Sequence, residues 1–108
     1  MLKDAFYNEL SKGKMLLHQE CFSDAYYHFE NAHVLGQTHT YRHTLSHYWM
    51  LKFGLRTKNV KEVLGQCVRM IASILFSKIW VPKGNTGGTN VSPLKPMPLR
   101  DELKIYFK

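Results

Sequence analysis

The sequence predicts an all-α fold, a bundle of four main helices closed by an irregular segment and a short last helix. Apolar residues recur at steps of three and four through most of the first 79 residues, which is the spacing of one helix face. The 108 residues, 44% of them hydrophobic, suit a single domain with a substantial core. We therefore expect one domain over 1–108, with the helical bundle in 1–79, the irregular segment in 80–98 and the short helix in 99–108.

Two short helices with a tight connection begin the chain and form an αα-hairpin. They are predicted over about 2–18 and 22–35. Their apolar positions, with one glycine among them, are Leu2, Phe6, Leu10, Gly13, Leu17, Phe22, Ala25, Tyr26, Phe29, Ala32 and Leu35. Ser23-Asp24 supplies N-cap chemistry near the start of the second helix, and Gly36 stands where a C-terminal cap is expected.

This hairpin resembles one tetratricopeptide repeat, because the residues from Gly13 to Leu35 follow the pattern Gly-x8-Phe-x2-Ala-x3-Phe-Glu-x-Ala. The sequence has no second copy at the repeat period of about 34 residues, and an array needs about three units to be stable. The resemblance implies a hairpin of this kind inside another fold. Because such hairpins leave a groove for a ligand peptide, it also implies a protein-interaction or structural module.

The third and fourth helices are predicted over about 38–55 and 60–79. The third is apolar almost all round, which is typical of a central helix, and its apolar residues are Tyr41, Leu45, Tyr48, Trp49, Met50 and Leu51. Asn59 is the expected N-cap of the fourth helix. The apolar stripe of that helix consists of Val60, Val63, Leu64, Cys67, Val68, Ile71, Ile74 and Leu75.

The pattern changes after residue 80. Residues 81–98 are rich in Gly, Pro and Asn, which exclude a regular helix or a central strand. So long an irregular stretch predicts a functional loop or a flexible tail, and its apolar residues indicate that it packs against the bundle. A short terminal helix is expected over 101–107.

Composition indicates a soluble, cytoplasmic protein. The first residues are too charged for a signal peptide, and the most apolar stretch, 70–76, is far shorter than the roughly 20 residues that span a bilayer. Cys21 and Cys67 lie at apolar positions and form no Cys-x-x-Cys pair. We interpret them as small core residues in a reducing cytoplasm rather than as a structural disulfide.

The net charge of +7 is compatible with binding to nucleic acid or to an acidic protein partner, and the distribution of the basic residues argues against nucleic acid. The fifteen basic residues are spread along the chain. The densest group lacks interleaved aromatic residues and matches no DNA-binding motif; it consists of Lys52, Arg56, Lys58 and Lys61. We interpret it as a solvated basic turn, and the sequence leaves the oligomeric state open.

The sharpest chemical feature is a ladder of His39, His43 and His47 at helical steps of four. Imidazole is a common ligand of transition metals, so this spacing predicts a metal site. His33 and Glu30 are further candidate ligands, since their helix is expected to lie against the third. Zn or Ni suits imidazole ligands, with Cu and Fe as alternatives. The competing interpretation is histidines that are hydrogen-bonded in the core, or exposed without a role.

Glu30 and His33 also form a Glu-x-x-His pair, which is the ligand pair of carboxylate-bridged di-iron bundles. Such a site needs two pairs and two further glutamates, and the sequence holds one pair. Glu30 also occupies the Phe-Glu position of the tetratricopeptide pattern, where it needs no metal. A mononuclear site is therefore the stronger interpretation.

A second candidate site is the loop of Lys83, Gly84, Asn85, Thr86, Gly87 and Gly88. Consecutive glycines can turn several backbone N–H groups toward one anion, and a lysine can add charge. We favour a tight turn instead, in which Asn85 and Thr86 bond their own backbone while Gly87 and Gly88 adopt positive φ.

The sequence carries no recognisable catalytic constellation, and we expect no enzyme: neither cysteine stands beside a histidine, and no pair among the eight carboxylates suits acid–base chemistry. The leading interpretation is a non-enzymatic cytoplasmic binding module whose histidine-bearing helix holds a transition metal. The alternative is a tetratricopeptide-like interaction or structural module without metal. Tyr7, Tyr27, Trp80 and Tyr106 would then form an exposed aromatic surface, unless Trp80 and Tyr106 seal the tail onto the bundle.

Several short boxes resemble a bacterial family of small proteins of unknown function: residues 32–37 (AHVLGQ) and 84–88 (GNTGG), followed by 91–93 (VSP) and 96–98 (PMP), together with Met50-Leu51 and Gly65-Gln66. The resemblance runs from about Tyr27 to Leu103 and implies an intracellular protein of one domain. It brings no activity, cofactor or catalytic residue. His33, His43 and His47 fall within the matching segments, whereas His39 does not.

Overall fold

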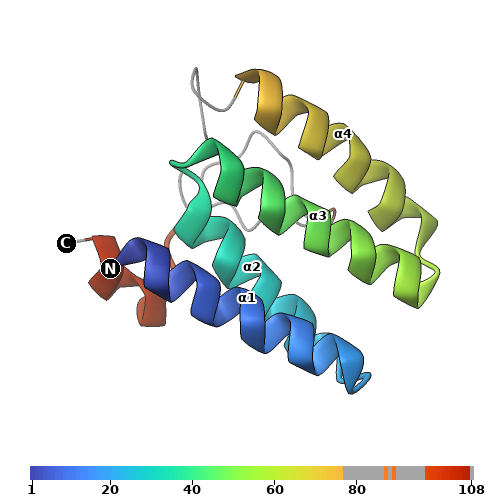
Figure 1. Cartoon of the computed structure of the whole chain (residues 1–108), viewed down its shortest axis with the longest axis horizontal. Coiled ribbons are helices and arrows are strands. Elements are labelled where there is room, and N and C mark those ends of the chain that lie inside the picture. Colours follow the sequence, from blue (N-terminus) through green and yellow to red (C-terminus); the bar gives the residue numbers. More distant parts are fainter. Residues whose placement is uncertain (77–86, 88, 90–96, 108) are drawn as a thin grey trace.

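The computed structural model describes residues 1–76, 87, 89 and 97–107 of the chain (Figure 1). These residues form four α-helices and one 3-10 helix and contain no strand, which confirms the predicted all-α bundle. The elements are α1 (Leu2–His18), α2 (Phe22–Gly36), α3 (Thr40–Thr57), α4 (Val60–Phe76) and the 3-10 helix η1 (Asp101–Phe107). None of these helices is long and apolar enough to cross a membrane.

The helices are arranged as two hairpins. α1 packs along α2, α3 packs along α4, and α2 lies against α3, so that α2 and α3 join the two pairs (Figure 1). The 3-10 helix η1 docks on α1 and α2 near the N-terminus of the chain. α2 is therefore flanked by α1 on one side and by α3 on another, which places its side chains between the two hairpins.

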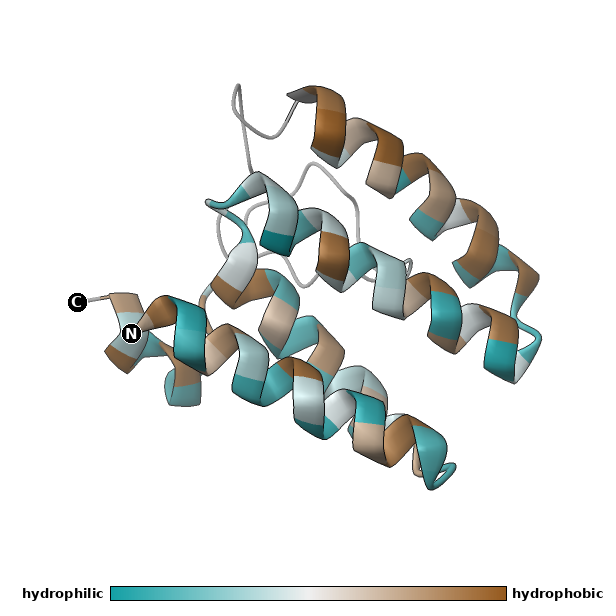
Figure 2. Ribbon diagram, in the orientation of Figure 1, coloured by the Kyte–Doolittle hydropathy of each residue, from teal (hydrophilic) through white to brown (hydrophobic). Residues whose placement is uncertain are grey.

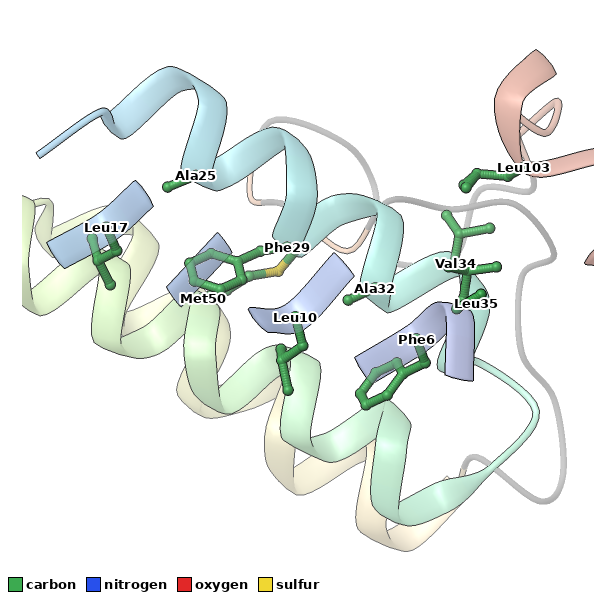
Figure 3. Packing of buried hydrophobic residues seen from close by; sticks show 11 residues of the cluster. Phe6, Leu10, Leu17, Ala25, Phe29, Ala32, Val34, Leu35, Met50 and Leu103 are labelled. Carbon is green, nitrogen blue, oxygen red and sulfur yellow. The ribbon is translucent and has the colours of Figure 1, made fainter. Parts of the chain in front are cut away.

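The apolar core lies between α1, α2 and α3 (Figure 3). Phe6 and Leu10 of α1, Phe29 of α2 and Met50 of α3 are at most 3% exposed. The Phe29 ring lies so close to Gly13 that a Cβ at this glycine would come within 2.6 Å of it. Gly13, which the sequence places among the apolar positions of this helix, thus lets α1 and α2 approach closely. Leu103 of η1 closes the core and is 1% exposed.

Most helix boundaries match the sequence prediction, and two end residues differ. α2 begins after Cys21, whose side chain makes no capping hydrogen bond, so Ser23-Asp24 lies in the first turn and the predicted N-cap is wrong. Gly36 is the last helical residue rather than a cap beyond the helix. Its role is packing, because a Cβ there would come within 3.0 Å of Phe6 and Arg42.

The start of α3 differs from the prediction, whereas the cap of α4 agrees with it. α3 begins two residues later than predicted, at Thr40. Asn59 is the N-cap of α4 as predicted, since its Oδ1 accepts a hydrogen bond from the Glu62 backbone N–H at 3.1 Å. The predicted end of α4 at residue 79 lies outside the described residues, as do Trp80 and, apart from residues 87 and 89, the 81–96 part of the irregular segment.

Both cysteines contradict the prediction that they belong to the core. Cys21 and Cys67 are exposed. Cys21 precedes α2 at the hairpin turn, and Cys67 lies on the outer face of α4. The apolar stripe around Cys67 does lie on one face of α4, but this face is exposed rather than buried.

α4 has the reverse of the usual polarity. The residues that it buries are polar, with Glu62, Gln66 and Ser73 at most 4% exposed. Most of its large aliphatic residues are exposed, and Figure 2 shows hydrophobic colour along the whole length of this helix at the edge of the molecule. Ser73 meets Thr44 of α3 through hydroxyl groups 2.7 Å apart. The contact between α3 and α4 is thus built on hydrogen bonds, and it lies beside the histidines of α3.

Candidate metal centre

Three histidine side chains from two helices meet between the hairpins. His33 comes from α2, and His43 and His47 come from successive turns of α3. All three are buried. The Nε2 atoms form a triangle with sides of 3.0 Å (His33–His43), 3.1 Å (His33–His47) and 3.2 Å (His43–His47). Three ring nitrogens thus converge on one point.

This triangle has nearly the dimensions of a metal ligand set. Nitrogens bound at about 2.0–2.1 Å to one tetrahedral ion lie about 3.3–3.4 Å from one another. The ring planes are inclined to each other by 54–69°, so the imidazoles approach from three directions rather than stacking. Among the described residues, His33, His43 and His47 form the one group of three potential metal ligands whose ligand atoms all lie within 4.8 Å of one another.

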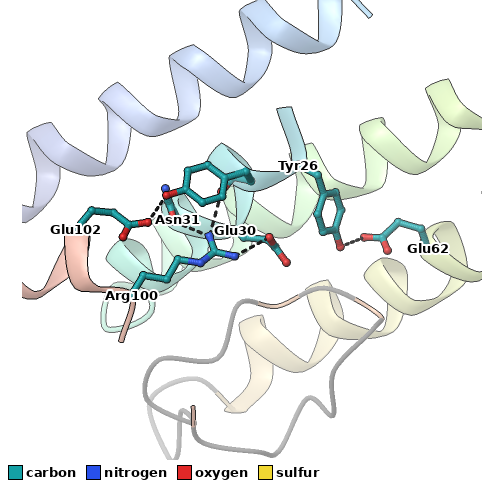
Figure 4. A network of polar contacts seen from close by, with 7 residues as sticks. Tyr26, Glu30, Asn31, Glu62, Arg100 and Glu102 are labelled. Atoms are coloured by element: carbon teal, nitrogen blue, oxygen red, sulfur yellow. Dashed lines mark hydrogen bonds and ion pairs between the residues drawn. The ribbon is translucent and has the colours of Figure 1, made fainter. Parts of the chain in front are cut away.

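His39 and Glu30, two further predicted ligands, lie outside this triangle. His39 is not part of the α3 ladder, because its backbone is extended and it forms the N-cap, with Nδ1 accepting from the Arg42 backbone N–H at 3.5 Å. Glu30 Oε1 pairs instead with the Arg100 guanidinium at 2.9 Å (Figure 4). The one-turn spacing thus relates only His43 and His47, and α2 supplies the third imidazole.

Gln66 of α4 holds the His47 ring from behind. The Gln66 Nε2 group donates to Glu62 Oε2 at 2.8 Å and to the Gly87 carbonyl at 2.9 Å. Because both of these groups only accept, the amide oxygen must face His47, where Oε1 lies 2.6 Å from Nδ1. His47 therefore carries its proton on Nδ1, and its Nε2 lone pair points into the triangle. Such a partner fixes the orientation and tautomer of a metal-binding histidine.

Glu62 anchors this chain of hydrogen bonds. Its Oε2 also accepts from the Tyr26 hydroxyl at 2.7 Å (Figure 4). Its Oε1 accepts from the Thr89 hydroxyl at 2.6 Å. Burial and the neighbouring Glu62 carboxylate raise the pKa of Tyr26, so the phenol stays a donor at neutral pH. The chain from Tyr26 through Glu62 and Gln66 to His47 links α2, α4 and α3.

Burial keeps the α3 histidines neutral. It lowers the pKa of His43 from 6.5 to about 4 and the pKa of His47 from 6.5 to about 3, where the nearby His43 adds a smaller effect. Neutral imidazole is the form that binds a metal ion. The Nδ1 atom of His43 is buried and has no hydrogen-bond partner among the residues that the structure describes.

Gly87 is the one residue of the predicted glycine loop that the structure describes, and it covers His33. Its φ of +81° is the left-handed conformation expected from turn chemistry. A Cβ on Gly87 would come within 2.5 Å of the His33 ring. Lys83, Gly84, Asn85, Thr86 and Gly88 lie outside the described residues, so the anion nest stays an untested alternative.

Sequence reasoning missed Tyr26, Glu62 and Gln66 as parts of this site. One signal was available: Glu62, Gln66 and Ser73 recur at helical steps on the face of α4 opposite its apolar stripe. When the helix is considered alone, a polar stripe predicts a face that is exposed to solvent. Only the position of α3 against it shows that these residues are buried.

The chain was compared with family models, curated proteins and solved structures. No curated protein and no solved structure matches it. A family model described as a protein of unknown function (DUF3703) matches residues 1–107, nearly the whole chain. The chain therefore belongs to the DUF3703 family of proteins of unknown function.

Proposed function

We propose that this protein is a non-enzymatic, cytoplasmic binding module that holds one transition-metal ion through His33, His43 and His47. The observation that carries the proposal is the triangle of Nε2 atoms with sides of 3.0–3.2 Å. A cation at the centre of the three rings would accept their lone pairs together. A hydrogen bond joins one donor to one acceptor, so hydrogen bonding within the triangle leaves at least one of the three Nε2 atoms without a well-placed partner there.

The surroundings support a built site rather than a chance cluster. Two of the ligands are held neutral by burial, and the hydrogen bond from His47 to Gln66 sets the tautomer that ligation needs. Zn or Ni suits three imidazoles, with Cu and Fe as alternatives. Three protein ligands leave a fourth position for water or a donor from another molecule. Such a site suits metal storage, sensing or transfer.

The test is elemental analysis of protein purified without a histidine tag, together with calorimetric titration of Zn²⁺ and Ni²⁺. We expect one metal ion per chain, lost in the His43→Ala/His47→Ala double variant. His18→Ala is the matched control, because His18 is an exposed histidine at the end of α1 and removing it should leave binding unchanged. Metal that is absent from the wild type, or bound equally by the double variant, would contradict the proposal.

A second candidate function is capture of an acidic protein segment in a cleft between α1 and α3. This cleft has a volume of about 510 Å³, and its lining includes Lys14, His18, Lys52 and Arg56 around the Trp49 ring. The Lys14 Nζ lies 4.7 Å from the centre of that ring. Clustered cations beside a partly buried aromatic ring suit carboxylates on a partner chain.

This second function is tested with a fluorescent hexaglutamate peptide. We expect anisotropy to show binding that weakens with salt and is lost in Lys52→Glu/Arg56→Glu. Lys3→Glu/Lys12→Glu on the exposed face of α1 changes the net charge equally and should retain most of the binding. An equal loss of peptide binding in both variants would show that net charge alone causes the binding and would contradict a specific site in the cleft.

A further inference from the structure

The outer face of α4 carries an uninterrupted apolar stripe. Six of its aliphatic side chains are 61–69% exposed: Val60, Leu64, Val68, Ile71, Ile74 and Leu75. The exposed Cys67 lies at the middle of the stripe. The residues 60, 64, 67, 71 and 74 are separated by steps of four and three, which is the heptad spacing of helices that pair along their length.

The fold of the single chain cannot bury this stripe by rotating α4. The opposite face holds Glu62, Gln66 and Ser73, all buried and hydrogen-bonded to the site or to α3. Turning α4 to bury the stripe would move Glu62, Gln66 and Ser73 to the surface and break these hydrogen bonds. The stripe therefore stays outward while the polar face serves the histidines.

The size of the stripe fits a protein interface. A soluble monomer rarely exposes a contiguous apolar patch beyond about 300–600 Å². Six aliphatic side chains exposed to this extent approach the roughly 800 Å² that each partner buries in a standard interface. The stripe contains no charged residue, so it offers an acidic or basic partner no charge to pair with.

The stripe also matches itself when it is read backwards. Reversal about the point between Cys67 and Val68 superposes Val60 on Leu75 and Leu64 on Ile71. An antiparallel pair of α4 helices would thus place Val60 against Leu75, Leu64 against Ile71 and Cys67 against Val68, with Ile74 opposite the exposed Lys61. This is the self-complementarity that a two-fold symmetric interface requires.

The geometry points to a second copy of this chain as the partner of this face, with the two α4 helices packed antiparallel about a two-fold axis near Cys67. This inference does not depend on the metal proposal, because it rests on the opposite face of α4. Each copy carries a net charge of +7, so the copies repel one another at long range. Salt screens that repulsion and leaves apolar burial intact, and dimerisation should strengthen as salt increases.

Sedimentation velocity of the full chain from about 1 to 200 μM, at low and high salt, tests the interface on the concentration scale of ordinary associations. We expect a monomer–dimer equilibrium that shifts toward dimer at high salt. Leu64→Glu/Ile71→Glu should be monomeric throughout, with unchanged far-ultraviolet circular dichroism. Leu55→Glu is the matched control, since Leu55 is a 57% exposed leucine of α3 outside the stripe, and it should dimerise normally.

Chemical cross-linking through Cys67 tests the geometry of the pair. In a Cys21→Ser background, a short bismaleimide should link two chains, because the proposed axis passes beside Cys67 and its copy. The cross-link should disappear in Cys67→Ser and in Leu64→Glu. Dimers that form but do not cross-link through Cys67 would overturn the antiparallel arrangement.

Two outcomes would overturn the proposed partner. One is a monomer at every concentration and salt, and the other is a dimer that persists in Leu64→Glu/Ile71→Glu. Binding to vesicles of phosphatidylcholine and phosphatidylglycerol is measured as well, since a basic protein with an apolar face can also bind an anionic lipid surface. A monomer that binds these vesicles and loses binding in the stripe variant would assign the face to a membrane surface instead.

Discussion

The two helical hairpins are built on opposite principles. The α1–α2 hairpin packs around the apolar Phe6, Leu10 and Phe29, and the polar residues that it buries, Glu30, Asn31 and His33, all lie in the second half of α2. The α4 helix of the second hairpin buries Glu62 and Gln66 and exposes aliphatic residues along its outer face. In the first hairpin apolar burial supplies the stability, and in the second a network of hydrogen bonds fixes the geometry around the histidines.

This difference indicates where function resides. A buried polar network is costly unless every member is satisfied, and here it supports three convergent imidazoles. The first hairpin, with α3, forms the scaffold that carries His33 to this network. We therefore expect mutations in the scaffold to change stability, and mutations in the network to change metal binding.

The largest effect is expected from truncating the core of the first hairpin. Phe29→Ala should lower the free energy of unfolding by about 3–5 kcal/mol, because it leaves a cavity beside Gly13. Ile71→Ala on the outer face of α4 should change it by less than about 0.5 kcal/mol at concentrations where the chain is monomeric. Urea unfolding measures both. Equal losses in the two variants would contradict the contrast between the hairpins.

Acid should lower the free energy of unfolding of the metal-free protein, because His43 and His47 of α3 are buried in their neutral form. His43 and His47 have pKa values of about 4 and 3 when folded, against 6.5 for an exposed histidine, so the unfolded chain binds more protons below about pH 6.5. Stability therefore falls as the pH drops below that value, by up to about 1.4 kcal/mol per pH unit for each histidine. Urea midpoints from pH 7.5 to 4.5 with a chelator measure this slope. The His43→Ala/His47→Ala variant should show a flatter profile.

Gly87→Ala should affect both stability and metal binding. Its positive φ and the contact with the His33 ring predict a loss of about 1–3 kcal/mol in unfolding free energy. Metal affinity should fall as well, because the ring must move. Gly54→Ala is the control, since this helical glycine lacks the positive φ and a Cβ there would have its closest contact at 3.1 Å. Thermal melts with and without Zn²⁺ separate the two effects.

Gln66→Leu should act mainly on the metal. Leucine has a similar volume but cannot accept the His47 Nδ1 proton, so we expect metal affinity to fall about 10–100-fold. Exposed Gln19→Leu is the matched control and should bind normally. Calorimetry measures both affinities. An unchanged affinity in Gln66→Leu would show that the hydrogen bond does not orient the ligand.

The smallest effect is expected at the start of α4. Asn59→Ala removes the side chain that caps the Glu62 backbone N–H and should cost about 1 kcal/mol. Asn59→Asp retains an accepting oxygen and should restore most of that stability. Urea unfolding of the pair measures the difference, and a loss of the same size in both would exclude capping as its cause.

The helices themselves were predictable from local patterns. The steps of three and four residues and the Asn59 cap depend only on neighbours along the chain, and the structure confirms them. The candidate site was predictable in part, because His43 and His47 are one turn apart on α3. The displacement of His39 to the N-cap depended on where α3 begins, and local patterns place helix ends poorly.

The sequence by itself determined an all-α chain, the approximate course of four helices and a pair of histidines on one helix face. Only the tertiary structure decided that His33 completes the triangle, that Glu30 pairs with Arg100, and that α4 turns its polar face inward. The physical reason is that periodicity defines two faces of a helix but not their neighbours. Which face is buried depends on what the adjoining helix presents, and here α3 presents histidines that need hydrogen-bond partners.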